Sequence, residues 1–454
     1  MLTIRTIRTV WTARLIAACL ALLTIAALLS ARTPAASAIG GALPPVLINE
    51  VLAHTDPPQV DSVELYNASG AAVDVGAWCF SDSPNNDPCR YRLPANTTIP
   101  AGGFLVLTRD DFDFGLSETG ETIVLTADAG PFAGAKHEVR FGASDNGVSM
   151  GRVVTSDGRE HFPQAQAVTL GAPNSPPQLS PVVLGAIMYN PPGSGFEYVE
   201  LVNTGTTPQT LCDGDAASCW RLEGVQQGGY PFPPGFTLPG KSVAYVTDAD
   251  PAAFRAAYGV PAAVQVAGLY TGTLSNSGET VALSRPGLGT GTITYVVVDE
   301  VTYSDVAPWP PEADGGGAAL RRRRLDGFGQ EPAHWQAGPS LGDPPGAAVV
   351  GFAPRDLPGG TRELAWATDA EHSLLGFTLL YSADGVRANA VRVGPELLPA
   401  QGNAHFGSRY AIVDSAPGAT GTYWLEAVGW KQDRRDIAAI PAVLPERFYL
   451  PLIQ

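Results

Sequence analysis

Short runs of apolar residues recur along the chain, and turn-forming residues separate them. The runs hold about four to eight β-branched, aromatic and leucine residues, and Gly, Pro, Asn and Asp bound them. Residues 63–67 alternate apolar and polar positions, which predicts a strand that is buried on one face. Regularly spaced short strands and turns favour antiparallel sandwiches over a parallel sheet. The pattern therefore predicts an all-β fold.

Many of these runs occur twice, in the same order. The offset between the two copies grows along the chain, so the second copy carries an insertion around residues 249–267. Within this insertion, the alanine-rich residues 252–258 predict one short helix. The matched blocks are 46–51 with 183–188, 63–67 with 198–203, 78–79 and 89–93 with 211–212 and 219–222, 99–103 with 238–242, and 116–125 with 274–283.

A third β-rich unit follows the repeat and begins near Ala347. Residues 363–368, 375–381 and 422–428 each predict a strand, and the spacing suits a fibronectin-III-like sandwich. Proline-rich junctions separate the units and favour extended, semi-rigid linkers. We therefore expect a signal segment at 1–38, domains at 43–175, 181–345 and 347–445, an apolar tail at 446–454, and junctions at 173–181 and 339–345.

The repeated blocks resemble the lamin tail domain, which is an immunoglobulin-like β-sandwich. The resemblance rests on the start Ile48-Asn49-Glu50, the strand Glu64-Leu65-Tyr66-Asn67, the turn Pro-Ala-Gly-Gly, the strand Leu-Ser-x-x-Gly-Glu-Thr and the closing residues 169–174. It covers about 45–345 in two copies, and the second departs at Leu184-Gly185-Ala186. The resemblance implies tandem immunoglobulin-like sandwiches. In bacteria this family occurs in exported proteins, often beside nuclease, phosphatase or other hydrolase domains.

The first residues are typical of a secretory signal. Arg5, Arg8 and Arg14 precede an apolar stretch at 15–29, and the small residues 36–38 follow it. We expect cleavage after Ala38, which predicts a secreted or cell-surface protein without a membrane span. An uncleaved anchor is a weaker alternative because the apolar run is slightly short. Lipidation at Cys19 is also disfavoured, since the apolar run follows this cysteine instead of preceding it.

The net charge of −16 argues against partners with a phosphate backbone. The exception to this acidity is the run Arg321-Arg322-Arg323-Arg324. Strand alternation should send two of these arginines to each face, where they pair with nearby acids. Docking of a polyanion or an acidic neighbour is the alternative. We expect no nucleic-acid partner.

Four cysteines of the expected mature chain fall in two sequence-close pairs, Cys79 with Cys89 and Cys212 with Cys219. In an oxidising compartment, this spacing predicts two local disulfides. Both pairs stand at the same place in the repeat. A metal site would need the two pairs within reach of each other, but they belong to different domains. The cysteines therefore favour structural roles.

The candidate catalytic and cofactor motifs lack the residues or the flanking structure that each motif requires. Residues 235–242 satisfy the phosphate-loop pattern, but a strand pattern follows them where that motif needs a helix, so a turn is favoured. The pair His137-Glu138 lacks the second histidine of a zinc helix because Phe141 stands there. The nucleophile-elbow motif Gly-x-Ser-x-Gly is absent from the sequence. We predict no catalytic residue, cofactor or metal site.

Acidic residues offer two weaker candidates. The clusters Asp110-Asp111-Phe112-Asp113 and Asp213-Gly214-Asp215 are expected in solvated loops, with weak calcium binding as the alternative. Glu64 and Glu200 recur at equivalent strand positions, where we expect a hydrogen-bonding or solvent-facing role.

These observations favour a non-catalytic binding or scaffolding protein. Its expected partners are proteins or glycans at the cell envelope, because sandwiches present loops at their ends and a tandem array spaces those loops apart. Two alternatives remain open: an accessory module of a secreted nuclease or phosphatase, and an enzyme with an unrecognised site. The sequence fixes neither the ligand nor the oligomeric state.

Overall fold

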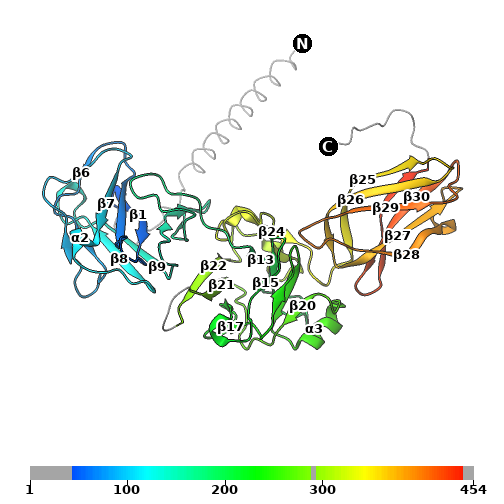
Figure 1. The fold of residues 1–454 in the computed structure, drawn as a ribbon, viewed down its shortest axis with the longest axis horizontal. Helices are drawn as coiled ribbons and strands as arrows, with labels where there is room; N and C mark the ends of the chain where they lie inside the picture. The colour runs from blue at the N-terminus through cyan, green and yellow to red at the C-terminus, as the bar shows by residue number, and fades with distance from the viewer. Residues whose placement is uncertain (1–42, 288–292, 443–454) are drawn as a thin grey trace, which may run out of the picture.

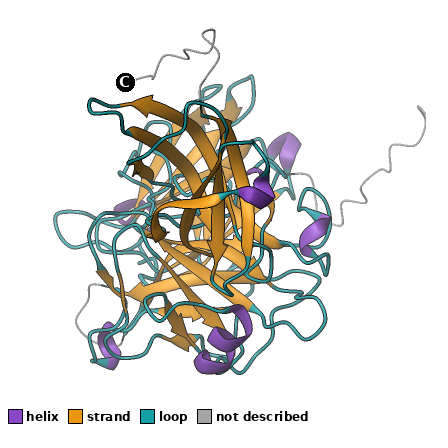
Figure 2. Ribbon diagram, turned by 90° about the vertical axis from the view of Figure 1, so that its right-hand side faces the viewer, coloured by secondary structure: helices purple, strands orange, loops and turns teal. Residues whose placement is uncertain are grey.

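The computed structural model describes residues 43–287 and 293–442. The expected signal at 1–38 and the apolar tail at 446–454 lie outside the described residues. The fold is all-β, as predicted, and consists of three sandwich units in sequence order along the long axis of the molecule (Figure 1). Helices are short and lie at the margins of the sheets (Figure 2).

Unit 1 is a sandwich of two antiparallel sheets whose inner side chains form one core. Ile48, Leu65, Phe80 and Ile123 are fully buried between the sheets. One sheet has the order β10 (Met150–Gly151), β1 (Val46–Leu52), β2 (Ser62–Asn67), β7 (Phe104–Thr108), and the other β5 (Tyr91–Arg92), β4 (Cys79–Ser81), β8 (Gly120–Thr126), β9 (Lys136–Gly142). Smaller elements are β3 (Val73–Asp74), β6 (Thr98–Ile99), α2 (Arg109–Phe112), η1 (Gly130–Phe132), β11 (Val153–Val154) and β12 (Glu160–His161).

Unit 2 has two sheets of the same kind with additions. Its larger sheet has the order β20 (Gln265–Ala267), β19 (Val243–Thr247), β14 (Tyr198–Asn203), β13 (Val182–Met188), β23 (Ala319–Arg322), β24 (Trp335–Gly338). The smaller sheet has the order β17 (Tyr230–Pro231), β16 (Arg221–Glu223), β21 (Thr280–Pro286), β22 (Tyr295–Thr302). Smaller elements are β15 (Gln209–Thr210), β18 (Thr237–Leu238), η2 (Ala216–Ser218), α3 (Pro251–Tyr258), η3 (Pro311–Ala313) and η4 (Pro332–His334).

The insertion in unit 2 forms the predicted helix, α3, and then the strand β20. Asp250 caps the helix by accepting hydrogen bonds from the backbone N–H groups of Ala252 and Ala253. Phe254 anchors α3 because its side chain is fully buried. β20 pairs with β19 in parallel, so the expectation of purely antiparallel sheets is wrong at this edge. The helix is the reason, since it returns the chain to the starting end of β19.

Unit 3 pairs a three-stranded sheet with a four-stranded sheet around Trp366 and Phe377. All three predicted strands are present, and β25 begins at Gly346, next to the expected start. The sheets have the orders β25 (Gly346–Asp356), β26 (Arg362–His372), β29 (Arg409–Asp414), and β28 (Val391–Pro399), β27 (Leu374–Ser382), β30 (Thr422–Gly429), β31 (Arg434–Pro441), with η5 (Arg387–Asn389) between β27 and β28.

Strand β2 differs from the predicted half-buried strand, because both of its faces are covered. Val63 and Leu65 point into the core, while Glu64 on the other face is also inaccessible to solvent. The loop 169–174 covers this outer face, and the backbone N–H of Gly171 donates to the Glu64 carboxylate. The alternation of residues 63–67 therefore separates an apolar face from a polar face, and both are buried.

Among the residues that the structure describes, no helix has the length and apolarity to cross a bilayer.

Candidate binding cleft between the first two units

A cleft of about 700 Å³ lies between units 1 and 2. Two sequence-distant strands contribute consecutive residues to its walls, and loops near β12 and β23 contribute aromatic rings. These residues are 138–143 from β9 and the following turn, 297–300 from β22, His161 and Phe162 from β12 and the residue after it, and Phe328. Residues 119–122, at the start of β8, line the cleft as well.

Both strands are edge strands. β9 is the last strand of the order β5-β4-β8-β9, and β22 is the last of β17-β16-β21-β22, within the described parts of the chain. The Gln164 side-chain amide donates to the Val297 carbonyl oxygen at 3.2 Å, so this carbonyl of β22 points toward unit 1. Neither edge carries a further strand in the described ranges, but Gly329 and Gln330 lie against the outer side of β22 at Glu300 and Thr302.

Polar contacts between the two units hold the cleft open at a fixed width. Arg285 of unit 2 forms an ion pair with Asp145 of unit 1. The backbone N–H of Ser156 donates to Glu331 Oε2 at 2.9 Å. The ring of His161 also meets the ring of Phe328 edge-on, with centroids 5.7 Å apart. Units 1 and 2 therefore behave as a joined pair around the cleft.

Carboxylates outnumber cations in the cleft wall. Glu121, Glu138 and Glu300 line it, together with Glu160 and Asp299, and Arg140 is the arginine among the lining residues. Burial raises the pKa of Glu300 and of Glu121, which places both carboxylates in partly desolvated positions. Glu160 and Asp299 are paired with Arg152 and Arg322, so the negative charge of the cleft wall comes from Glu121, Glu138 and Glu300, and it disfavours anionic ligands.

Two neighbouring residues that line the cleft differ in how many hydrogen bonds their side chains form. Glu160 accepts hydrogen bonds from His137 and Arg152, and these outweigh burial and lower its pKa to about 2. His161, the next residue, has a buried Nε2 without a hydrogen-bond partner among the described residues, and burial lowers its pKa. Because this Nε2 is inaccessible to solvent, the ring of His161 lines the cleft without presenting that atom to it.

A second cluster of charged groups lies where units 2 and 3 meet. Glu200 on β14 is inaccessible to solvent and contacts Arg321 Nη2 at 3.0 Å, Tyr245 Oη at 2.9 Å and His405 Nε2 at 2.5 Å. Burial alone would raise the pKa of Glu200, but the charges of Arg321 and His405 outweigh it and lower the pKa to about 2. This cluster ties unit 3 to unit 2 through a fully buried carboxylate.

Gly185 makes room for the His405 ring. A Cβ at this position would lie 2.3 Å from the Val202 side chain and 2.9 Å from His405 Nε2. Asn49 stands at the equivalent place in unit 1, where its amide donates to Glu64 Oε1 at 2.7 Å. The departure at Leu184-Gly185-Ala186, visible in the sequence, therefore marks the contact with unit 3. Sequence reasoning missed His405 because nothing near it in the chain indicates a partner.

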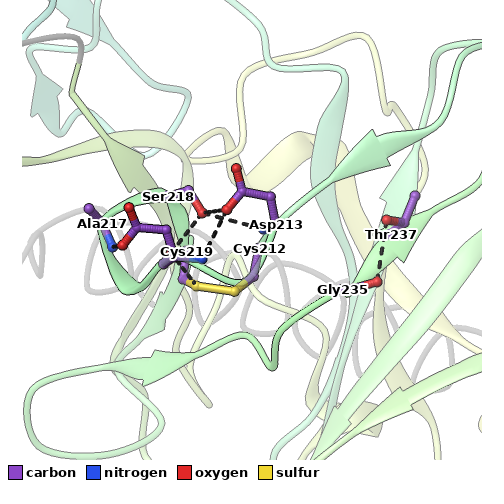
Figure 3. Close-up of a disulfide and its surroundings, with 8 residues drawn as sticks. Cys212, Asp213, Ala217, Ser218, Cys219, Gly235 and Thr237 are labelled. Atoms are coloured by element: carbon purple, nitrogen blue, oxygen red, sulfur yellow. Dashed lines mark hydrogen bonds between the residues drawn. A yellow bond between two sulfur atoms is a disulfide. The ribbon is translucent and has the colours of Figure 1, made fainter.

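The four predicted cysteines form the two predicted disulfides, Cys79–Cys89 and Cys212–Cys219. Figure 3 shows the second of them beside Asp213 and Ser218. The Ser218 hydroxyl and the backbone N–H of Asp215 both donate to Asp213, so this acidic cluster is used within its own turn. Groups of three or more His, Cys, Asp or Glu side chains placed to hold a metal are absent from the described ranges.

The other acidic cluster lies in a helix instead of the expected loop. Asp110 and Asp111 belong to α2, and Asp113 ends it in a left-handed conformation. The reason is local, since Asp111 Oδ2 accepts the backbone N–H of Thr108 at 2.8 Å and forms a capping box.

The phosphate-loop pattern at 235–242 contains the short strand β18 and then the predicted turn, at 240–241. Strand β19 follows it, and Lys241 Nζ donates to the carbonyl oxygen of Thr204 at 2.6 Å. His137 likewise has a structural role, because its Nδ1 accepts the backbone N–H of Ile48 at 2.9 Å.

The four arginines do not divide equally between two faces of a strand. β23 ends at Arg322, so only Arg321 and Arg322 alternate, and both are buried in ion pairs with Glu200 and Asp299. Arg323 and Arg324 lie beyond the strand on the surface, where Arg323 donates to the Ala333 carbonyl oxygen. The prediction of pairing with acids is confirmed for the two buried residues and for Arg324, whose Nε lies 3.4 Å from Asp326 Oδ1.

Comparison with known families assigns one domain of the chain to a family. Residues 41–146 match the model of the Lamin Tail Domain, so unit 1 contains this immunoglobulin-like domain. No curated protein matches the chain.

Proposed function

We propose that this chain is a non-catalytic binding and scaffolding protein that acts outside the cell or on its surface. The observation that carries the proposal is the joined array: a lamin tail domain is fixed to a second sandwich around an acidic cleft, and a third sandwich is fixed to the second. The two disulfides support export, because such bonds persist in oxidising compartments.

Unit 2 is, on this proposal, a second lamin-tail-like domain. Register supports it: Glu50 pairs with Glu64 after a bulge in β1, and Ala186 pairs with Glu200 after the matching bulge in β13. Buried polar contacts recur as well. Leu184 donates its backbone N–H to Asp299 at 2.8 Å, as Ile48 does to His137 at the equivalent place in unit 1.

Further recurring contacts support the same assignment. Asn67 and Asn203 each donate to the carbonyl oxygen four residues ahead, at 2.8 and 2.9 Å. Glu121 and Glu279 each accept the backbone N–H of the serine four residues before them. The Leu-Ser-x-x-Gly-Glu-Thr motif thus has one physical role in both units, which is to close the turn before a core strand.

Unit 3 is, on the same proposal, a fibronectin-III-like spacer. Its support is the packing of a three-stranded sheet on a four-stranded sheet. Tyr423 on β30 also donates to Asp414 at 2.7 Å, which links the two sheets across the core.

Retention on isolated cell envelopes of the source organism tests the proposal. Purified chain is incubated with intact envelopes, with protease-treated envelopes and with envelopes stripped of glycans. We expect retention on intact envelopes and its loss after one of the two treatments, which identifies the partner as protein or glycan. Release of all the protein from intact envelopes would overturn the proposal.

A hydrolase screen addresses catalysis. Phosphodiester, phosphomonoester, glycoside and peptide substrates are offered with and without divalent metals, and we expect no turnover above a heat-denatured control. Turnover that one carboxylate or histidine substitution abolishes would contradict a non-catalytic role. Co-purification with a secreted nuclease or phosphatase would favour an accessory module instead.

A further inference from the structure

We infer that the cleft between units 1 and 2 binds an extended, basic peptide segment that adds as a strand to the exposed sheet edge of β9 and lies against β22. The inference rests on the proposed binding function and names the partner chemistry of one site. An edge strand offers a row of backbone N–H and C=O groups, and an extended peptide can satisfy them by strand addition. Here the edge of β9 faces a cleft whose opposite wall includes β22 of the other unit.

The structure already contains a small version of this interaction. The side-chain amide of Gln164 in unit 1 donates to the Val297 carbonyl oxygen of β22, as the backbone N–H of an added strand would. A group from unit 1 thus reaches the backbone of β22 at Val297. Such a segment would run along the lining residues 297–300 on one side and 138–143 on the other.

The size of the cleft selects a single extended chain. A volume of about 700 Å³ lies in the range of sites that enclose a short ligand, and it is too small for a folded domain. Charged side chains on β9, such as Lys136 and Glu138, also protect this edge from pairing with another open sheet. The contacts Arg285–Asp145 and Ser156–Glu331 join the two units that form the cleft.

The carboxylates of the cleft favour a peptide with basic side chains. Glu138 is exposed on β9 and carries no ion pair among the described residues, and Glu300 faces the cleft from β22. Lysine or arginine side chains of the peptide would meet these carboxylates. Because side chains of a strand alternate between two faces, the remaining positions would point to the rings of Phe162 and Phe328 and should be apolar.

The test uses the full chain and two fluorescent peptides of about ten residues, a length that matches a long strand. One alternates Lys with Val, and the other alternates Glu with Val. Fluorescence anisotropy should show saturable binding of the Lys–Val peptide and none of the Glu–Val peptide. A Lys–Val peptide with N-methyl groups on alternate residues keeps the charge but loses backbone donors, and should bind about tenfold or more weakly.

Two pairs of variants locate the site. Gly142 lines the cleft and a Cβ there meets nothing within 4 Å, so Gly142→Trp places an indole on the cleft wall and should abolish binding. Gly346→Trp is its control, because Gly346 lies on β25 and its Cβ position is equally free. Glu138→Lys should weaken binding about tenfold, since one ionic contact becomes a repulsion. Asp110→Lys makes the same charge change on exposed α2, outside the cleft, and should leave the affinity unchanged.

Each outcome decides the inference. Equal binding of the Lys–Val and Glu–Val peptides, full affinity of the N-methylated peptide, or full affinity of Gly142→Trp would overturn it. Absence of binding by the Lys–Val peptide would overturn it too. If the wild-type chain is still retained on cell envelopes in that case, the proposed function stands and only the cleft assignment fails. If the chain neither binds the Lys–Val peptide nor is retained on envelopes, both the cleft assignment and the proposed function are rejected.

Discussion

Glu64 and Glu200 occupy equivalent positions on β2 and β14, and both are buried, so neither faces solvent. Their partners differ. Glu64 is held by neutral donors, the Asn49 amide and the Gly171 backbone N–H, and burial raises its pKa above the usual 4.5. Glu200 faces Arg321 and His405, and its pKa falls to about 2. The expected hydrogen-bonding role is confirmed for both, but only one carboxylate is held by cations.

The two glutamates should therefore respond to acid in opposite directions. A depressed pKa stabilises the folded state fully above pH 4.5 and loses this contribution as the pH falls toward 2. A raised pKa has the reverse effect, because the folded state takes up its proton first and gains stability as the pH falls through that raised value. On acidification, the destabilisation by Glu200→Gln should shrink, and that by Glu64→Gln should grow.

Hydrogen exchange of the β14 and β2 segments, compared with wild type at each pH, measures these costs separately. Near neutral pH, Glu200→Gln should cost about 3–5 kcal/mol because it leaves Arg321 buried without a counter-charge. The matched Glu64→Gln variant should cost less. Costs that change in the same direction with pH in both variants would contradict the two environments.

Gly185 should tolerate no side chain. Gly185→Ala brings a methyl group into the Val202 side chain and the His405 ring, so we expect a loss of about 1–3 kcal/mol in unit 2. Faster exchange should appear in β13 and also in the His405 loop of unit 3. Gly142→Ala is the control, because its added methyl has open space. Protection that changes in β13 alone would mean that Gly185 does not position the contact with unit 3.

At the scale of elements, local pattern predicted most strands and the α3 helix, but not their partners. Residues 252–258 form a helix because alanines and a buried Phe254 suffice for one. The parallel pairing of β20 and the burial of both faces of β2 depend on segments far away in sequence, such as the loop 169–174. The cleft was beyond prediction for the same reason, since its edges β9 and β22 come from different units.

The disulfides fix the turns that lead into or out of core strands, and each closes a short loop. Their sequence separations are 10 and 7 residues, which corresponds to about 2.5–3 kcal/mol for each in the chain-entropy model. Replacing Cys79 and Cys89 by Ser should lower the free energy of unfolding of unit 1 by about this amount and leave unit 2 unchanged. The Cys212 and Cys219 double variant should do the reverse. Urea unfolding measures both, and free thiols in the oxidised wild-type protein would argue against the bonds.

At the scale of the whole molecule, polar contacts join three apolar cores. Units 2 and 3 share the buried Glu200 cluster, and Asn403 donates to the Lys241 carbonyl oxygen at 2.8 Å. Units 1 and 2 share partly exposed contacts instead, since the Arg285 and Asp145 side chains are 22% and 13% exposed. Buried charged contacts resist separation more than exposed ones do. The joint beside the cleft is thus the weaker of the two.

Removing the contacts beside the cleft should loosen the array without unfolding its units. Arg285→Ala combined with Glu331→Ala removes the ion pair to Asp145 and the hydrogen bond from Ser156. Small-angle scattering should then report a broader distribution of distances between units 1 and 2, while thermal unfolding of the sandwiches changes little because their cores are untouched. Arg355→Ala combined with Glu363→Ala is the matched control, since it removes an ion pair within unit 3.

The variant that lacks the contacts beside the cleft should also bind the Lys–Val peptide more weakly, because a cleft that is no longer held open must be ordered on binding. Scattering and peptide affinity identical to wild type would mean that the cleft is held by the remaining contacts alone, such as Gln164 on Val297 and His161 against Phe328.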